Sequence, residues 1–474
     1  MCAKGAFVMA NNKLIKRLIL IAVGALVSAI LAFFAVLFSI RIIKENKYNR
    51  ALEHIENHEY EEALDLLKDL DDYKDAEDKY KLARYMSRGD YKKAIEEFNL
   101  TEIHIPNGEL TIKAEQFKDC KTLKKVVLPN SITGIGDEAF AYCYGLKTIV
   151  LGNGIKTIGK SAFYNCTSLE SISLGNQLVT IKDSAFKNCE SLTTIQLPDS
   201  VENLGDNAFF NCESLQSVTL SNKLSYVSAY SFAFCINLTS ITVPDSATSI
   251  KDNAFENCTN LQSVTIGNHV TAIFPKAFYN CVNLSNLTFG SSLKAIGKDA
   301  FSNCESLQSV TLPDSLTNLS EYAFYQCYNL KTLTIGDKLK EIGAFAFYKC
   351  SSLENVDLGE SLQTIGDNAF GYCKKLSSIE LPNTLQQIGA SAFAFSGLES
   401  ILIPTSVTRI SNNAFKNCTH LQTITFESDS SWYRTTSRSD WELKTNGTAV
   451  NLSSPSKNSY YFVEDYPNNY WYKE

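Results

Sequence analysis

Cysteine recurs every 23 residues along most of this 474-residue chain. The series comprises Cys120, Cys143, Cys166, Cys189, Cys212, Cys235, Cys258, Cys281, Cys304, Cys327, Cys350 and Cys373. A fixed period of this length indicates a solenoid, in which each repeat forms one coil and contacts mainly its two neighbours. The series slips once: Ser396 replaces the next cysteine, one residue is missing before Leu398, and the last cysteine is Cys418. The period therefore predicts the fold but does not identify a ligand.

Around each cysteine the chain repeats the frame Ala-Phe-x-x-Cys-x-x-Leu-x-x-Ile-x-Leu-Pro, and fourteen phenylalanines keep this register from Phe117 to Phe415. The Leu-x-x-Ile-x-Leu-Pro part predicts a short parallel strand that the proline ends. The Ile-Gly-Asp-x-Ala-Phe-x-x-Cys part predicts a single helical turn, capped by Asp or Ser, with Phe and Cys on its buried side. The predicted fold class is a repeat solenoid of the α/β leucine-rich repeat type, over residues 100–426. Leu100, Ile103 and Ile105 match only the strand half of the frame, which predicts an amino-terminal capping half-coil.

Because this frame persists through so many coils, the chain resembles the BspA-like class of leucine-rich repeat proteins. That resemblance implies a non-catalytic, cell-surface repeat protein. It also implies a binding function, since some members of the class bind host matrix proteins or mediate attachment. The resemblance does not identify the partner of this chain.

The cysteines of the ladder point the same way from successive coils, and parallel Cβ vectors make poor disulfides. We therefore expect buried free thiols that pack as small hydrophobic side chains. No coil supplies a clustered set of Cys and His ligands, so we predict no metal site and no cofactor.

The amino-terminal segment predicts a membrane anchor. An uncharged apolar stretch, residues 18–40, follows the basic residues Lys13, Lys16 and Arg17. As a helix it rises ~35 Å, enough to cross a bilayer, and it is longer than the apolar part of a cleaved signal peptide. We expect an uncleaved signal anchor with residues 1–17 as the cytoplasmic tail, a single pass through the plasma membrane, and an extracellular carboxyl-terminal region. Basic residues also follow the stretch, so the inverted topology, with a cytoplasmic scaffold, stays open; free thiols would suit that compartment.

Residues 44–99 predict helices with a second, shorter repeat. The sets Tyr60, Ala63, Leu64 and Tyr91, Ala94, Ile95 lie 31 residues apart, and each set falls on one helix face. The segment resembles a degenerate tetratricopeptide-type hairpin, whose usual period is ~34 residues. We expect a helical stalk, and peptide docking is the alternative.

One outward position of the predicted strands carries threonine in six consecutive coils. These residues are Thr219, Thr242, Thr265, Thr288, Thr311 and Thr334. A second file, mostly serine, lies two residues earlier. Threonine is favoured on any solvated strand face, and unlike stacked charges it does not repel its neighbours. The alternative is an extended protein-binding face, which is how solenoids usually bind. Threonine files also occur in ice-binding β-solenoids, but the second file here is irregular.

Aromatic residues are concentrated in two further places. One set lies between the ladder Phe and Cys: Tyr142, Tyr164, Phe210, Phe234, Tyr279, Tyr325, Tyr348 and Tyr372. These rings either cover the joints between coils or anchor a partner. The second set lies in residues 427–474, which contain Trp432, Trp441 and Trp471. We expect a small β cap there, with a hairpin turn at Asn446-Gly447; stacking of the tryptophans on a glycan is the alternative.

A net charge of -7 gives no basic face for nucleic acid. No nucleophile elbow, phosphate loop or zinc motif is present, so we predict no enzyme and no catalytic residue. The sequence as a whole predicts a membrane-anchored surface protein that binds an extracellular protein or glycan. The rivals are a structural spacer, or cell-envelope glycan attachment protein, and the cytoplasmic scaffold.

Overall fold

The computed structural model describes residues 2–70, 72–428 and 431–473. The chain divides into two compact units, Met1–Asn99 and Leu100–Glu474. The described residues of the first unit form helices, and every strand among the described residues lies in the second unit.

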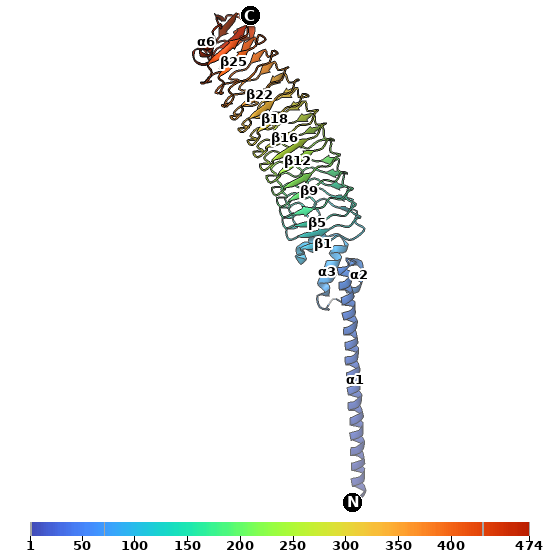
Figure 1. Cartoon of the computed structure of the whole chain (residues 1–474). Coiled ribbons are helices and arrows are strands. Elements are labelled where there is room, and N and C mark those ends of the chain that lie inside the picture. The colour runs from blue at the N-terminus through green and yellow to red at the C-terminus, as the bar shows by residue number, and fades with distance from the viewer. Residues whose placement is uncertain (1, 71, 429–430, 474) are drawn as a thin grey trace. The chain divides into compact units, whose positions relative to one another are not determined.

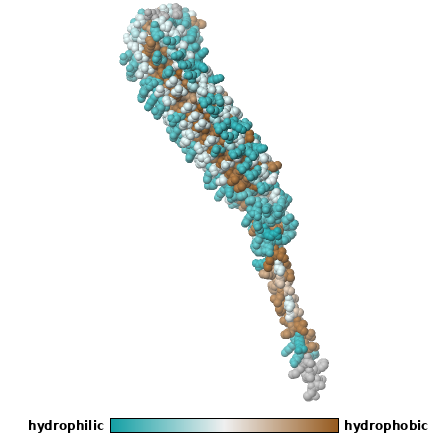
Figure 2. Space-filling model, turned by 45° about the vertical axis from the view of Figure 1, so that its right-hand side comes forward, coloured by the Kyte–Doolittle hydropathy of each residue, from teal (hydrophilic) through white to brown (hydrophobic). Residues whose placement is uncertain are grey.

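The first unit begins with one long helix, α1 (Cys2–Glu56). Its residues Asn11–Glu56 form the one helix among the described residues that is long and apolar enough to cross a membrane. Large apolar side chains lie on its surface; Leu20, for example, is 77% exposed. Figure 2 shows this apolar surface in brown, between hydrophilic stretches at both ends. The predicted span, residues 18–40, lies inside α1, and the helix continues without a break through the predicted boundaries at residues 17 and 44.

Three shorter helices follow: α2 (Tyr60–Leu67), α3 (Ala76–Ser87) and α4 (Tyr91–Phe98). Helix α2 packs against α1 and α3, and α3 packs against α4. The shorter repeat places equivalent residues in the interior, because Tyr60 and Ala63 in one copy and Tyr91 and Ala94 in the other are buried. Burial raises the pKa of Tyr60 to about 12. The repeat seen in the sequence is thus the packing pattern of consecutive helical hairpins.

The second unit is a parallel β-solenoid, and its coils stack into a gently curved column (Figure 1). Each Leu-x-x-Ile-x-Leu segment lies on the side of the column that we call the first sheet face, and successive strands pair in parallel with a 23-residue offset, as in Glu102↔Lys125. The strands of this face are β1 (Glu102–His104), β3 (Lys125–Val127), β5 (Thr148–Val150), β7 (Ser171–Ile172), β9 (Thr194–Gln196), β11 (Ser217–Thr219), β12 (Ser240–Val243), β14 (Ser263–Ile266), β16 (Asn286–Thr288), β18 (Ser309–Thr311), β20 (Thr332–Thr334), β22 (Asn355–Asp357), β25 (Ser400–Ile403) and β27 (Thr423–Phe426).

A second set of two-residue strands, also parallel, runs along the column. It consists of β2 (Thr111–Ile112), β4 (Gly134–Ile135), β6 (Thr157–Ile158), β8 (Thr180–Ile181), β10 (Asn203–Leu204), β13 (Ser249–Ile250), β15 (Ala272–Ile273), β17 (Ala295–Ile296), β19 (Asn318–Leu319), β21 (Glu341–Ile342), β23 (Thr364–Ile365), β24 (Gln387–Ile388) and β26 (Arg409–Ile410). The sequence did not predict these strands. Their Ile or Leu points into the core, so most coils contribute to two sheets.

The repeat solenoid is confirmed, but the predicted helical turn in each coil is wrong. Residues 100–426 contain no helix. Where the turn was expected, Glu138 and Tyr142 have left-handed backbones with φ of 55° and 62°. As a result, the amide of Ala141 donates to Glu138 within the coil, at 3.0 Å, whereas the amide of Phe140 donates to Ala162 in the next coil, at 2.7 Å. Hydrogen bonds that a helix would satisfy internally therefore join neighbouring coils.

A stack of phenylalanine rings fills the centre of the solenoid. The rings from Phe117 to Phe415 are fully buried, and successive centroids lie 4.9 to 5.6 Å apart with interplanar angles of 11° or less. At the amino-terminal end Ile103 and Ile105 are buried and β1 pairs with β3, so the half-coil seen in the sequence forms the first rung. One 23-residue repeat thus carries the chain from one ring of this stack to the next.

The carboxyl-terminal segment covers the last coil. Its strands β28 (Trp432–Thr435), β29 (Thr448–Val450) and β30 (Tyr470–Lys473) are antiparallel, and β30 pairs with β26. The helices are α5 (Arg438–Leu443), α6 (Pro455–Tyr460) and the π-helical η1 (Tyr461–Asp465). The Asn458 amide in α6 donates to the Ile424 carbonyl of β27 at 2.9 Å. The segment therefore closes the ends of both sheets, where unpaired edges would otherwise invite aggregation.

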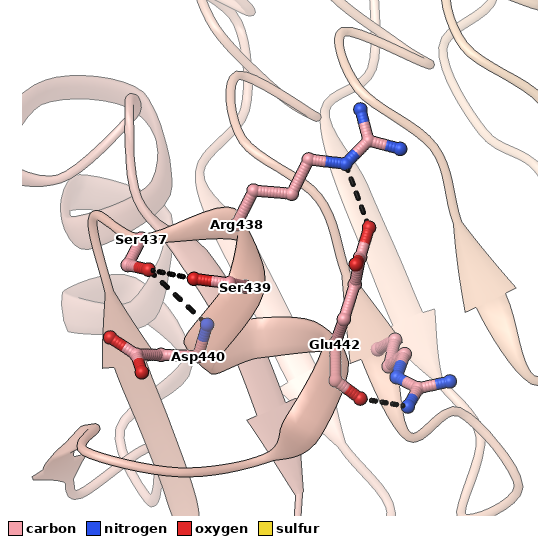
Figure 3. A network of polar contacts seen from close by, with 6 residues as sticks. Ser437, Arg438, Ser439, Asp440 and Glu442 are labelled. Carbon is pink, nitrogen blue, oxygen red and sulfur yellow. Dashed lines mark hydrogen bonds and ion pairs between the residues drawn. The ribbon is translucent and has the colours of Figure 1, made fainter.

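The predicted hairpin turn at Asn446-Gly447 is wrong. Strands β28 and β29 do pair, but residues 436–447, including α5, connect them. Figure 3 shows how α5 is held: Ser437 accepts from the Asp440 amide at 3.2 Å, and Arg438 pairs with Glu442 at 2.9 Å. Arg409 of the last coil donates to the Glu442 carbonyl at 2.9 Å. Helix α5 is thus tied directly to the solenoid, which a two-residue turn could not achieve.

Candidate binding surfaces

The six predicted threonines lie in one file on the first sheet face. Thr242, Thr265 and Thr288 are opposite one another on paired strands, and Thr311 is opposite Thr334. Five of the six are exposed and Thr334 is half-buried. The structure therefore brings these residues together as a row of hydroxyl and methyl groups, which the break in strand pairing between β16 and β18 divides in two. Because strand pairing fixes the backbone, the row is presented with little conformational freedom.

Charge divides the first sheet face into three zones. Within the strands from β9 to β20 the outward residues are only Thr, Ser, Asn and Gln, and one exposed lysine, Lys331, lies directly before β20. Towards the amino-terminal end Lys125 pairs with Glu102 at 2.7 Å and Lys147 pairs with Glu170 at 3.0 Å. Beyond β20 the outward residues include Glu354, Asp357 and Glu380, of which Glu354 pairs with Lys375 at 3.0 Å. The neutral centre is thus bounded by balanced charge at one end and by excess carboxylate at the other. Reading the outward positions coil by coil would have revealed these zones from the sequence.

The first sheet is interrupted between β7 and β9, between β16 and β18, and between β22 and β25. No strand of the first sheet forms between Asp357 and Ser400, although the repeat places one there. Two depressions lie at these interruptions: one of about 810 Å³ beside Thr219, and one of about 650 Å³ around Asp357. A third, of about 310 Å³, is lined by Thr334, Asp357 and Glu380. Thr219 and Thr334 therefore border hollows in the first sheet face.

The ladder cysteines are buried free thiols, as the sequence predicts. From Cys143 onward each Sγ donates to the carbonyl of the Phe in the preceding coil, at 3.0 to 3.4 Å. Burial raises the pKa of these thiols, that of Cys235 to about 12. They are consequently poor nucleophiles, because the reactive form of a thiol is the thiolate. Sequence reasoning predicted their packing but missed this hydrogen bond. No cluster of three or more His, Cys, Asp or Glu able to hold a metal occurs in the described part of the chain.

The turn aromatics are half-buried and several pair across coils. Tyr142 contacts Tyr164 at 5.3 Å between centroids, and Tyr325 stacks on Tyr348 at 5.5 Å. These rings therefore cover joints between coils while leaving an edge or a face in solvent.

The three tryptophans lie in the interior of the carboxyl-terminal segment. Trp432, Trp441 and Trp471 are 2%, 5% and 1% exposed. The indole of Trp471 stacks on Phe462 at 4.2 Å, and the Trp441 N–H donates to the Trp471 carbonyl at 2.9 Å. This packing corrects the expectation that the tryptophans can stack on a ligand, because such buried rings offer no free face. The structure places them as the core of the cap.

The stacked parallel strands, the inward Leu and Ile ladder and the sheet face define a leucine-rich repeat solenoid. The model of the BspA type leucine-rich repeat region matches residues 91–216, 179–306, 271–374 and 340–445. These overlapping matches cover most of the chain, which therefore belongs to the BspA-type leucine-rich repeat family.

The solved structure of one relative agrees with this assignment. A leucine-rich repeat protein from Bacteroides ovatus is 30% identical, with a TM-score of 0.62, and the match covers 69% of this chain and 87% of that one. A leucine-rich cell surface protein from Faecalibacterium prausnitzii is 27% identical, with a TM-score of 0.42, covering 75% and 91%. No protein of curated function matches the sequence. Proteins with this fold are generally non-catalytic and bind other proteins.

Proposed function

We propose that this chain is a membrane-anchored cell-surface protein that binds a protein partner, such as a host matrix protein, through the neutral centre of the first sheet face. The observation that carries the proposal is the uncharged file from Thr219 to Thr334, in which five of the six threonines are exposed. Its strands pair in parallel on either side of the break between β16 and β18. Such a face binds without desolvating charged groups, and its many small contacts add up over several coils.

In the proposed organisation residues 1–17 are cytoplasmic, residues 18–40 cross the plasma membrane and residues 44–99 form a stalk. The solenoid of residues 100–426 and the cap of residues 427–474 are extracellular. The apolar surface of α1 supports the anchor, and membership in a family of surface proteins supports the orientation.

The test is attachment of cells that carry the double variant Thr265→Lys and Thr288→Lys to immobilised host matrix proteins. These side chains are exposed and adjacent on paired strands, so two lysines place like charges in the middle of the neutral zone. We expect attachment to fall about tenfold or more, with the circular dichroism spectrum unchanged.

The matched control is Asn203→Lys with Asn318→Lys, which adds the same charge at exposed strand positions of the second sheet. The control should attach like the unmodified protein. Equal attachment by all three proteins would remove the first sheet face from the binding site.

A structural spacer, or a cell-envelope attachment protein, is the second candidate, and the unbroken stack of phenylalanines favours it because such a stack stiffens the solenoid. A spacer tolerates both double variants but depends on length. Removing three whole coils should then abolish its function, while a binding face should keep activity in proportion to the coils that remain.

A further inference from the structure

A row of aromatic rings runs along the turns of the carboxyl-terminal coils. We call Tyr325, Tyr348, Tyr372 and Phe395 the aromatic row. Successive centroids lie 5.5, 5.3 and 4.4 Å apart, so each ring contacts the next across a coil boundary. The four residues lie on the turns and not on the first sheet face.

Two members of the row occupy backbone positions that disfavour them. Tyr372 and Phe395 immediately precede the position of the ladder cysteine and have φ of 62° and 60°. Asparagine holds this left-handed position in half of the coils, as at Asn257, because its short side chain tolerates the conformation. A bulky aromatic residue there is strained. The turn imposes this left-handed conformation in every coil, and Tyr142 and Phe234 adopt it too, so the strain alone does not mark a site.

The row ends where the repeat slips. Tyr372 covers one face of the Phe395 ring at an interplanar angle of 13°. The equivalent residue of the following coil is Asn417, so no ring stacks on the opposite face, and Phe395 is 38% exposed. Ser396 and Gly397 follow directly, and a Cβ on Gly397 would clash with the carbonyl of Lys374. The replacement of an aromatic residue by Asn417 thus leaves one face of the Phe395 ring open at the end of the row.

That open face borders a pocket of about 470 Å³, a size typical of small-ligand sites. Its lining residues are Lys374, Phe395, Ser396, Gly397, Asn417, Thr419 and His420. One aromatic ring is therefore surrounded by hydroxyl, amide and imidazole groups and by one ammonium group. None of the seven residues carries a carboxylate.

From this lining we propose that the pocket binds an acidic saccharide unit, a pyranose that carries a carboxylate. The apolar C–H face of the sugar stacks on Phe395, as aromatic faces accept apolar and positively polarised groups. Asn417, Thr419 and His420 provide hydrogen bonds for its hydroxyl groups, and Lys374 pairs with the carboxylate. The site is independent of the protein-binding face, since it lies on the turns.

The test measures binding of three acidic oligosaccharides to the full chain in detergent: a hyaluronan hexasaccharide, a hexagalacturonate and an oligosialic acid. Chitohexaose is the neutral probe. We expect at least one acidic probe to bind more tightly than chitohexaose. Phe395→Asn should weaken that binding about tenfold, because it removes the stacking face. Lys374→Gln should reduce the preference for the acidic probe over chitohexaose.

The matched control is Phe234→Asn, which makes the same replacement at the same left-handed position in a distant coil. It should leave saccharide binding unchanged. Both asparagine variants should melt no lower than the unmodified chain, so loss of binding cannot be attributed to unfolding. The proposal is overturned if no acidic probe binds at millimolar concentration, if Phe395→Asn binds like the unmodified chain, or if Phe395→Asn impairs only a protein partner. These outcomes do not depend on whether the Thr265→Lys and Thr288→Lys variant loses attachment.

Discussion

The cysteine ladder should make the solenoid unusually sensitive to alkaline pH. Burial raises the pKa of thiols such as Cys258 and Cys304 well above the ordinary value of 9.0. The folded protein therefore keeps them neutral at pH 10, while the unfolded chain ionises them. The stability that each thiol contributes is fully present below pH 9 and is lost as the pH rises through 9 towards the native pKa.

The magnitude follows from that linkage. In the unfolded chain the thiol has a pKa of 9.0. Its ionisation stabilises the unfolded chain by about 1.4 kcal/mol at pH 10 and by less than about 0.1 kcal/mol at pH 8. For three adjacent coils, those of Cys258, Cys281 and Cys304, the loss between pH 8 and pH 10 is about 4 kcal/mol. A loss of this size is a large fraction of the free energy of unfolding of a typical domain.

The assay is urea unfolding followed by circular dichroism, under reducing conditions, at pH 8 and pH 10. The comparison protein is the triple variant Cys258→Ala, Cys281→Ala and Cys304→Ala. The variant starts less stable at pH 8, because it has lost three hydrogen bonds and left small cavities. It should then lose about 4 kcal/mol less between the two pH values than the unmodified chain. Ionisation of lysine and tyrosine is common to both proteins and cancels. An equal loss in both would refute the inference that these thiols stay protonated in the native state.

Three further predictions concern the packing of the repeats and of the carboxyl-terminal segment. Phe255→Ala should cost about 3–5 kcal/mol in urea unfolding, because the ring is fully buried between two others at 5.4 and 5.1 Å. Gly267→Ala should lower the melting temperature, since its Cβ would lie 2.6 Å from the Pro244 carbonyl oxygen; Gly134→Ala, with its nearest neighbour at 3.9 Å, should not. Trp471→Ala should release the carboxyl-terminal segment to limited proteolysis while the solenoid stays resistant, and a resistant segment would contradict its assignment as the cap's core.

Sequence reasoning recovered the parts of the fold that the period records directly. Residues such as Phe255 and Cys258 recur once per coil, so their burial and stacking follow from the repeat alone. The turn geometry does not follow, because a spacing of three residues suits a helical turn and a left-handed turn equally. What decides between them is the hydrogen bond from Phe140 to Ala162, and that partner lies 22 residues away in the next coil.

The candidate site was predictable to a similar degree. Alternation along each strand placed Thr265 and Thr288 on an outward face, and the pairing confirms that placement. Composition predicted a folded aromatic tail, but the number of aromatic residues cannot say whether Trp441 faces solvent or the core. The open ring at Phe395 required the structure, because its exposure depends on which side chains of the neighbouring coils cover it.

The central claim is that the solenoid lies outside the cell, where its sheet face can meet a partner. Brief trypsin treatment of intact cells, followed by mass spectrometry of the supernatant, tests it directly. An extracellular solenoid should release peptides from residues 101–474 while a cytoplasmic marker protein stays intact. Protection of those residues until the cells are lysed would contradict it and would place the solenoid inside, as a scaffold.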